Sequence, residues 1–315
     1  MAHETFSRLV ILGAGAIGAG IGALLWEAGT NVLLIARGPH RDAMATHGLD
    51  LRLPSGPRRL RLPLGTLQDL RPGDLVLLAT MGHDTIKATA ALPAGWPVVS
   101  LQNGEAPLHA LDRPVIAAVV YVPAERRAPG VVVMAGSPYP GAILLGGWPS
   151  GRVGPEAALA EALRQAGFRT AIRDPIAPWV RAKSLRNLGG ALIALCDAPP
   201  AELLEALVAE ARAVYAAAGL PVADDADFDA AVGPLETVAV DGLPRVGGST
   251  RHALSRGDRL ETASLHGPIV ALGRQWGVPT PRNTAIIALA EQAAAEGWPA
   301  GGMAPAALRA ALEQG

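Results

Sequence analysis

The sequence predicts an α/β fold of two domains, an N-terminal Rossmann-type dinucleotide-binding domain followed by an all-helical C-terminal domain. In the first half, short apolar runs alternate with helical patterns, and the first run leads directly into a Gly-x-Gly-x-x-Gly motif. The second half contains long Ala- and Leu-rich stretches with the spacing of helices. The pattern changes near Arg173-Asp174-Pro175, so we expect one domain over residues 1–173 and the other over residues 174–315.

The glycine motif lies between a predicted strand over residues 9–12 and a helix that extends to about Gly29. A second strand over residues 31–36 completes a βαβ unit, the context in which this motif binds a dinucleotide. The first glycine then allows a tight turn, the second lets the backbone approach a pyrophosphate, and the third lets helix and strand pack closely. A structural Gly-rich turn is the alternative. The flanking strands favour a binding loop made of Gly13, Ala14, Gly15, Ala16, Ile17 and Gly18.

The apolar stretch from Leu9 to Leu25 carries no charge and approaches the length of a membrane span. Its many glycines fit a strand, a turn and a buried helix better than a span. Glu4 and Arg8, which precede it, do not form the basic start of a signal peptide. We therefore expect no membrane segment.

The composition of the 315 residues argues against several classes of partner. Half of the residues are hydrophobic and 17% are charged, so the chain can form a sizeable core. The formal net charge is −1 without a long run of like charge, which disfavours nucleic acid and anionic membranes. The single cysteine, Cys196, excludes an internal disulfide and a multi-cysteine metal site. We expect a buried thiol, no metal, and a reducing, cytoplasmic setting.

The end of the second predicted strand indicates which dinucleotide is bound. NAD sites usually carry Asp or Glu there, to bind the ribose 2′-OH. This strand ends Ile35-Ala36-Arg37 without an acid, and an arginine can pair with the 2′-phosphate of NADP. We therefore expect NADP(H), with Arg37 as its contact and Arg41 as a second candidate. An ordinary solvated arginine is the alternative for Arg37.

Further apolar runs are predicted to extend the sheet, and the last two of them are expected to be antiparallel: residues 74–79, 97–101, 114–122, 131–135 and 142–145. Ligands of open α/β sheets bind beyond the carboxyl ends of the strands. The loop Gln102-Asn103-Gly104 lies at such an end, so Asn103 is a candidate contact to nicotinamide or substrate. Asn-Gly is also a plain turn signal, which is the alternative.

Only two of the 27 basic Lys and Arg residues are lysines, Lys87 and Lys183. Lysine can release a proton, whereas arginine is effectively never deprotonated. Lys183 lies in an apparent helix and shares a face with Asn187 at i+4, before Gly189-Gly190 interrupts the helix. We interpret Lys183 as a candidate for proton transfer, with a surface lysine kept by chance as the alternative. Lys87 we interpret as a surface residue.

The second half is predicted to hold further helices over residues 201–218, 260–275 and 284–296. A polar loop that contains Ser249 precedes the helix bearing Glu261, which stands among apolar neighbours. Taken alone, Ser249 is a helix-cap candidate and Glu261 a solvated helix residue.

Together these features resemble the ketopantoate reductases (2-dehydropantoate 2-reductases). The resemblance rests on the Gly-rich start, Leu-Gln-Asn-Gly at 101–104, Lys-x-x-x-Asn at 183–187, the Ser249 and Glu261 pair, and Gly-Val-Pro-Thr-Pro-Arg-Asn-Thr at 277–284. It covers essentially the whole chain. It implies a helical C-terminal domain like that of 6-phosphogluconate dehydrogenase, with the active site in the cleft between the domains. It also implies an oxidoreductase of pantothenate biosynthesis that reduces ketopantoate to pantoate with NADPH, and a homodimer.

The resemblance also implies roles for individual residues. Lys183 matches the general acid that protonates the carbonyl oxygen, and Glu261 matches its acidic partner, which binds substrate. Asn103 matches an asparagine near nicotinamide and substrate, and Asn187 and Ser249 match substrate-binding positions. The chemistry is consistent, because hydride addition builds negative charge on oxygen that an ammonium group both stabilises and protonates.

Two positions depart from the family's pattern. Met81 stands where a lysine usually contacts the NADP phosphate, so a preference for NADP would depend on Arg37. Ala191 stands where many members have a second asparagine, so the pocket could suit a different 2-oxo acid. Three alternatives stay open: a relative that acts on another oxo acid or a sugar-derived acid, a non-catalytic NADP-binding regulatory protein, and an opine- or imine-type dehydrogenase.

Overall fold

The computed structural model describes residues 5–243, 247–257 and 260–313. The chain divides into two compact units. The first consists of Met1–Asn103, Pro107–Val180 and Asp224–Arg245, and the second of Gly104–Ala106, Arg181–Ala223 and Val246–Gly315. The domain boundary expected between residues 173 and 174 stays a prediction.

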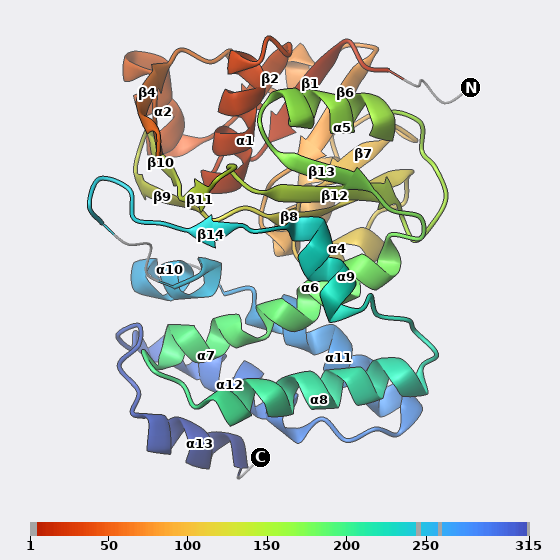
Figure 1. Cartoon of the computed structure of the whole chain (residues 1–315), viewed down its shortest axis with the longest axis vertical. Coiled ribbons are helices and arrows are strands. Elements are labelled where there is room, and N and C mark those ends of the chain that lie inside the picture. The colour runs from red at the N-terminus through yellow and green to blue at the C-terminus, as the bar shows by residue number, and fades with distance from the viewer. Residues whose placement is uncertain (1–4, 244–246, 258–259, 314–315) are drawn as a thin grey trace. The chain divides into compact units, whose positions relative to one another are not determined.

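The first unit is built on a sheet of eight strands in the order β13-β12-β8-β7-β6-β1-β2-β5 (Figure 1). All neighbouring strands are parallel except β8 and β12, which run antiparallel. The central strands are apolar runs without alternation, as expected where helices or a second sheet cover both faces. In chain order the strands are β1 (Arg8–Leu12), β2 (Val32–Ile35), β5 (Leu64–Gly65), β6 (Asp74–Leu78), β7 (Val98–Ser100), β8 (Val115–Tyr121), β12 (Ala142–Gly147) and β13 (Arg169–Ile172).

A second sheet of four strands has the order β4-β3-β10-β9. Its members are β3 (Leu49–Leu53), β4 (Gly56–Leu60), β9 (Ala124–Ala128) and β10 (Val131–Met134). The prediction that residues 131–135 extend the main sheet is therefore wrong. The hairpin of β3 and β4 offers an edge on which β10 pairs in parallel, while β10 itself runs antiparallel to β9.

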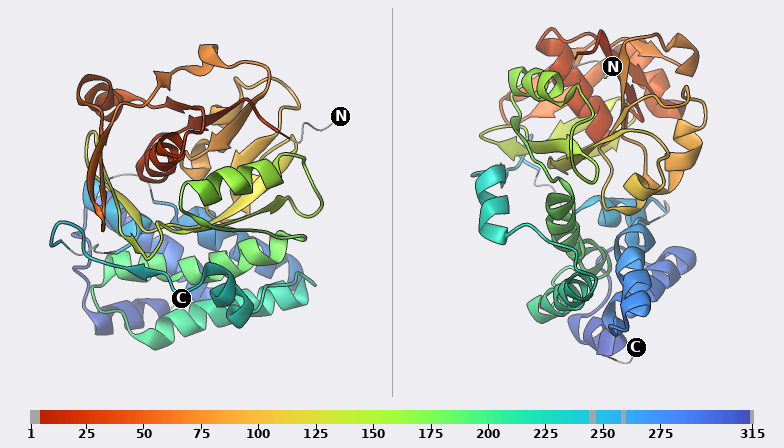
Figure 2. Two further views of the ribbon diagram at one scale, coloured as in Figure 1. Left: turned by 45° about the horizontal axis from the view of Figure 1, so that its top comes forward. Right: turned by 90° about the vertical axis from the view of Figure 1, so that its right-hand side faces the viewer.

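Helix α1 (Ala16–Glu27) packs between the two sheets of the first unit. It contacts β1 and β2 on one side and β3, β9 and β10 on the other (Figure 2). The contact is close, because a Cβ at Gly20 would lie 2.7 Å from Sδ of Met134. Burial on two sides explains why this helix carries small and apolar residues without a charge before Glu27. Among the described residues, no helix is long and apolar enough to cross a membrane.

The segment Asp224–Arg245 follows helices of the second unit and returns to the first. It contains α9 (Asp225–Val232) and β14 (Glu236–Thr237), which pairs antiparallel with β11 (Gly136–Ser137). The side chain of Asp224 caps α9 by accepting from the N–H groups of Ala226 and Asp227.

The other helices of the first unit are short and join its strands. They are α2 (Gly38–His47), α3 (Thr85–Thr89), α4 (Ala106–His109), whose first residue belongs to the second unit, and α5 (Glu156–Gln165), with 3₁₀ turns at Leu67–Asp69 and Gly82–Asp84.

The second unit is helical. Its helices are the C-terminal part of α6 (Ala177–Asn187), then α7 (Gly189–Leu195), α8 (Ala201–Ala217), α10 (Ser249–Arg256), α11 (Thr262–Trp276), α12 (Pro281–Glu296) and α13 (Pro305–Glu313). Helix α12 contacts four of the others, α7, α8, α11 and α13, around a core of Leu, Ile and Ala side chains. The expected class, a Rossmann-type α/β domain with a helical C-terminal domain, is confirmed.

Candidate functional site

The predicted dinucleotide loop connects β1 to α1 in a tight turn. Gly13 has φ +102°, which only glycine adopts without strain, and a Cβ there would lie 2.7 Å from the backbone nitrogen of Thr80. Gly13 N and Ala14 N both donate to the carbonyl of Ile35, so the end of β2 holds the loop. The turn thus has the backbone geometry that the motif requires.

The remaining glycines of the motif have opposite surroundings. A Cβ at Gly18 would lie 2.3 Å from the carbonyl oxygen of Gly13, so the loop and α1 pack with no room for a side chain. At Gly15, which caps the N-terminus of α1, a Cβ would have nothing within 4 Å. The space beside Gly15 lies at a helix N-terminus, where backbone N–H groups and the helix dipole favour an anion. These residues fit a pyrophosphate.

Arg37 follows β2 and stands at the N-cap of α2, with its side chain exposed. Arg41 lies in α2 itself and has Nη1 3.6 Å from Oδ1 of Asp42. Within the described part of the chain Arg37 has no such acidic neighbour, and β2 ends at Ile35 without an acid. Of the two candidate arginines, Arg37 is therefore the one whose charge is available for a phosphate.

Met81 and Asn103 lie at the same edge of the main sheet as the glycine loop. They follow β6 and β7. Strand β6 pairs in parallel with β1, and β7 pairs in parallel with β6, so the carboxyl ends of all three strands lie at this edge (Figure 1). Met81 is about one-third exposed, and Asn103 is half-buried. The first unit thus brings together its predicted cofactor residues.

Gln102 connects these two loops through hydrogen bonds. The sequence does not single it out as a functional residue. Its Nε2 donates to both oxygens of Thr80 and to the carbonyl of Met81, at 3.0 to 3.2 Å. Its Oε1 accepts from the hydroxyls of Thr85 and Ser100. The position inside Leu-Gln-Asn-Gly was the only signal in the sequence. The consequence is that the residue before Asn103 is fixed to the loop that carries Met81.

Lys183 and Asn187 lie on α6 in the second unit, one helical turn apart as predicted. Nζ of Lys183 donates to Oδ1 of Asn187 at 2.7 Å, and both side chains are half-buried. Lys183 is thus partly buried and hydrogen-bonded, and its part in proton transfer stays a prediction. Lys87, by contrast, is exposed on α3.

Glu261 and Ala191 are also in the second unit. Glu261 stands at the N-cap of α11 and is 8% exposed, so it is not a solvated helix residue. Ala191 is buried in the apolar core on α7 and offers no hydrogen bond. Ser249 begins α10, but its side chain lies outside the described part of the structure. Cys196, at the end of α7, is buried as expected.

A buried polar network joins α8, α11 and α12 in the second unit. Nδ2 of Asn283 donates to the carbonyl of Leu207 and to Oε2 of Glu210, which leaves its Oδ1 to accept from Nδ1 of His266 at 2.8 Å. His266 is 1% exposed. Burial lowers the pKa of His266 to about 4 and outweighs the hydrogen bond with Asn283, which raises it. The imidazole is therefore neutral at neutral pH.

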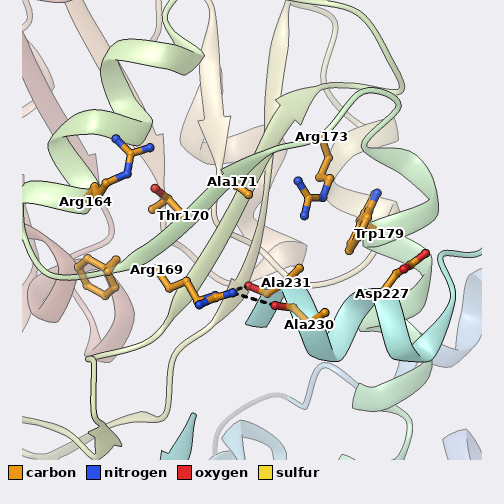
Figure 3. A pocket seen from close by; sticks show the side chains of 10 residues that line it. Arg164, Arg169, Thr170, Ala171, Arg173, Trp179, Asp227, Ala230 and Ala231 are labelled. Carbon is orange, nitrogen blue, oxygen red and sulfur yellow. Dashed lines mark hydrogen bonds between the residues drawn. The ribbon is translucent and has the colours of Figure 1, made fainter. Parts of the chain in front are cut away.

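A pocket of about 590 Å³ lies in the first unit among residues of α5, β13, α6 and α9, and none of the predicted site residues lines it (Figure 3). Its arginines are engaged by the protein itself. Arg169 donates to the carbonyls of Ala230 and Ala231, and the guanidinium of Arg173 lies 4.5 Å from the ring centroid of Trp179. We assign this pocket no part in the reaction.

Comparison with known proteins identifies the family. The sequence pattern described as "Ketopantoate reductase PanE/ApbA" matches residues 9–150, and "Ketopantoate reductase PanE/ApbA C terminal" matches residues 190–294. A 2-dehydropantoate 2-reductase from Archaeoglobus fulgidus is 30% identical over 299 residues, which cover 90% of this chain and 96% of the relative. The chain belongs to the ketopantoate reductase family.

Solved structures agree with this assignment. A PanE/ApbA family ketopantoate reductase from Ralstonia eutropha JMP134 aligns with a TM-score of 0.76 and 30% identity, over 92% of this chain and 99% of that one. A D-mandelate dehydrogenase, known in a ternary structure with NADH and anilino(oxo)acetate, has a TM-score of 0.77 at 22% identity. It covers 92% of this chain and 99% of its own, and shows the shared fold. The ketopantoate reductases, to which the chain belongs, are dinucleotide-binding oxidoreductases.

Proposed function

We propose that the chain reduces 2-dehydropantoate (ketopantoate) to pantoate with NADPH, and that Lys183 is the general acid. The observation that carries this proposal is the Lys183–Asn187 hydrogen bond on α6, found in a member of the ketopantoate reductase family. It places the ammonium group of one of the chain's two lysines in a defined, partly buried position. Relatives named 2-dehydropantoate 2-reductase supply the substrate, and with it a step of pantothenate biosynthesis.

The residues of the first unit suit the cofactor. The loop from Gly13 to Gly18 leaves open space beside Gly15 at the start of α1, where the pyrophosphate would be held. Asn103 would lie near the nicotinamide, fixed through Gln102. NADPH, when bound, supplies the hydride that adds to the keto carbon.

The residues of the second unit would donate the proton and orient its donor. As the carbonyl carbon gains its new C–H bond, the π electrons of C=O move to oxygen, which takes a proton from Nζ of Lys183. The ammonium also stabilises the developing negative charge before the proton moves. Asn187, which accepts from Nζ, would orient it, and Glu261 and Ser249 would bind the substrate. Lys183, left neutral after the transfer, regains its proton from solvent.

The preference for NADPH rests on Arg37. The exposed guanidinium after β2 would pair with the 2′-phosphate, and no acid at the strand's end is present to bind a free 2′-OH. Met81 contributes no charge to this contact. NADH is the alternative cofactor, as bound by the D-mandelate dehydrogenase that shares the fold.

The proposed function is tested with purified protein, NADPH and ketopantoate. Oxidation of NADPH with formation of pantoate, identified by chromatography against the authentic compound, is the expected result. Tight binding of NADPH without oxidation by any carbonyl substrate would contradict it and favour a regulatory protein. Turnover that requires an added amine would instead indicate an opine- or imine-type dehydrogenase.

A second substrate has one observation in its favour. Ala191 is buried in the core of the second unit, so α7 presents no polar side chain at this position. A missing hydrogen bond can redirect specificity strongly when the site was built for a hydroxyl group. The ratio of kcat/KM for ketopantoate to that for 2-oxo acids without a hydroxyl distinguishes the two: a ratio well above one supports ketopantoate, and a ratio below one supports another acid.

We further propose that the protein is a cytoplasmic homodimer. A dimeric ketopantoate reductase from Staphylococcus aureus shares the fold, with a TM-score of 0.68 at 18% identity. Light scattering on the purified chain tests the oligomeric state, and a mass equal to the 32.3 kDa of one chain would contradict a dimer.

A further inference from the structure

A buried ion pair in the second unit joins the loop after Asn103 to the helix that carries Lys183. Nε of Arg181 lies 2.9 Å from Oε1 of Glu105, and the two side chains are 8% and 6% exposed. Glu105 belongs to the short segment Gly104–Ala106 that packs with the second unit, although the residues on both sides of it belong to the first. The pair is therefore the polar anchor of this segment.

Arg181 is held on its other sides as well. Its Nη1 donates to the carbonyl of Pro221 at 3.0 Å, and its guanidinium lies 5.9 Å from the ring centroid of Tyr215. Tyr215 is 3% exposed, and burial together with the negative charge of Glu105 raises the pKa of its hydroxyl above the ordinary value. Glu105 thus meets a cation whose position is already fixed.

The places of the two residues along the chain connect the pair to the proposed reaction. Glu105 comes two residues after Asn103, and Arg181 comes two residues before Lys183 on the same helix. On the other side of Asn103, Gln102 is bound to the loop at Thr80 and Met81. The segment that carries Asn103 is consequently fixed at both ends.

Stability alone is a weak reason for such a pair. Removing two charges from water costs several kcal/mol per ion, and well-packed apolar residues in place of a buried ion pair are often as stable or more stable. What an ion pair adds is a defined distance between two backbones. Here Asn103 lies two residues before Glu105, and Lys183 lies two residues after Arg181.

We propose that Glu105 and Arg181 are positioning residues, which hold the segment Gly104–Ala106 on α6 and thereby restrain the backbone that leads into Asn103. The inference rests on the proposed function and deepens it. The chain's own second unit supplies the anchor, so the loop after β7 is ordered by α6 whether or not a substrate is bound.

The test uses the full-length protein with two variants of the pair. Glu105→Gln leaves Arg181 buried without its counter-ion, and the double variant Glu105→Leu/Arg181→Met replaces both charges by apolar side chains of similar volume. The double variant is expected to keep its Tm, because no buried charge is left unpaired. Glu156→Gln is the matched control. Its carboxylate is also buried, and it accepts from the N–H groups of Val153 and Gly154 at the start of α5.

Two readouts are needed. The rate of amide hydrogen exchange in a peptide spanning residues 101–108 shows, without any substrate, whether the loop is held in place. The kcat and the Kd for NADPH show whether the loss of the pair affects the reaction or cofactor binding. We expect exchange in the double variant to be at least about tenfold faster, kcat at least about tenfold lower, and the Kd for NADPH within about twofold of the wild type. Glu156→Gln should change none of the three.

Three results separate the possible failures. Unchanged exchange at residues 101–108 in the double variant overturns the anchoring, whatever the activity. Faster exchange with wild-type kcat overturns the positioning role, since a purely structural pair would behave in this way. If the wild type turns over no 2-oxo acid, the proposed function fails by itself, and exchange alone then decides whether the pair anchors the loop.

Discussion

The ammonium group of Lys183 donates a hydrogen bond of 2.7 Å to Oδ1 of Asn187, one turn further along α6. The bond fixes the direction of Nζ, since a lysine side chain has many rotamers of similar energy when nothing holds it. A proton donor must reach its acceptor at hydrogen-bond distance, so its orientation contributes directly to the rate.

Replacing Asn187 by leucine keeps the volume and removes the acceptor. We expect kcat for ketopantoate reduction to fall about tenfold or more, because a single net hydrogen bond to a charged group is worth about 1.5–3 kcal/mol. The Kd for NADPH, measured by fluorescence titration, should stay the same. Asn31→Leu in the first unit, at an exposed asparagine, is the control. Wild-type kcat in Asn187→Leu would show that the bond does not orient the acid.

Gly15 and Gly18 allow the cofactor loop to be tested by one kind of substitution at two positions. A methyl group at Gly18 would lie 2.3 Å from the Gly13 carbonyl, so we expect Gly18→Ala to destabilise the protein by about 1–3 kcal/mol. At Gly15 the methyl group has open space. Gly15→Ala should therefore keep the wild-type Tm and raise the Kd for NADPH at least about tenfold. Normal NADPH binding by Gly15→Ala would show that no pyrophosphate lies against this residue.

The two arginines after β2 differ in their neighbours, and this difference predicts cofactor selectivity. Arg37→Ala should raise the Kd for NADPH by about 10- to 100-fold, which corresponds to the binding free energy of one charge-assisted hydrogen bond. The Kd for NADH should stay nearly unchanged. Arg41→Ala, whose charge is already beside Asp42, should have a much smaller effect. Equal losses for both cofactors in Arg37→Ala would contradict a contact with the 2′-phosphate.

His266 makes the stability of the protein depend on pH. Its pKa is about 4 in the folded state and about 6.5 in an unfolded chain. Between these two pH values the imidazole is mostly protonated in the unfolded state and mostly neutral in the folded state. Its stabilising contribution is complete above pH 6.5 and is lost as the pH falls toward 4. The loss is about 3 kcal/mol, at 1.36 kcal/mol per pKa unit.

Urea unfolding at pH 7 and at pH 4 measures this effect by comparison of variants. His266→Gln should be less stable than the wild type at pH 7, and the difference should shrink toward pH 4. His47→Gln, at an exposed position on α2, should follow the wild type at both values. A constant difference between His266→Gln and the wild type would mean that His266 does not titrate in this range.

Local patterns predicted much of the fold. The strand, glycine turn and helix at the start are contiguous in sequence, and the Lys183–Asn187 pair follows from helical periodicity alone. Sheet membership did not follow, because an apolar run shows that a strand is buried without showing its partner. For this reason the apolar run at residues 131–135 predicts a strand of the main sheet, whereas β10 pairs with β3.

The contacts between distant segments could not be predicted at all. The pairing of β14 with β11 brings Asp224–Arg245 back to the first unit, and no local sequence pattern predicts this pairing. Nothing in the sequence marks Glu105 and Arg181 as partners. Charged residues are almost never fully buried unless they are paired, and the pairing is a property of the fold.

The role of Lys183 as proton donor is tested by comparing kcat for ketopantoate reduction, and the Kd for NADPH, among the wild type, Lys183→Ala and Lys183→Arg. Arginine keeps the positive charge but does not readily release a proton. We predict that both variants bind NADPH as the wild type does and lose about 10²- to 10⁴-fold in kcat, the contribution of a general acid. A Lys183→Arg variant with wild-type kcat would contradict the role of Lys183 as proton donor, because charge alone would then be sufficient.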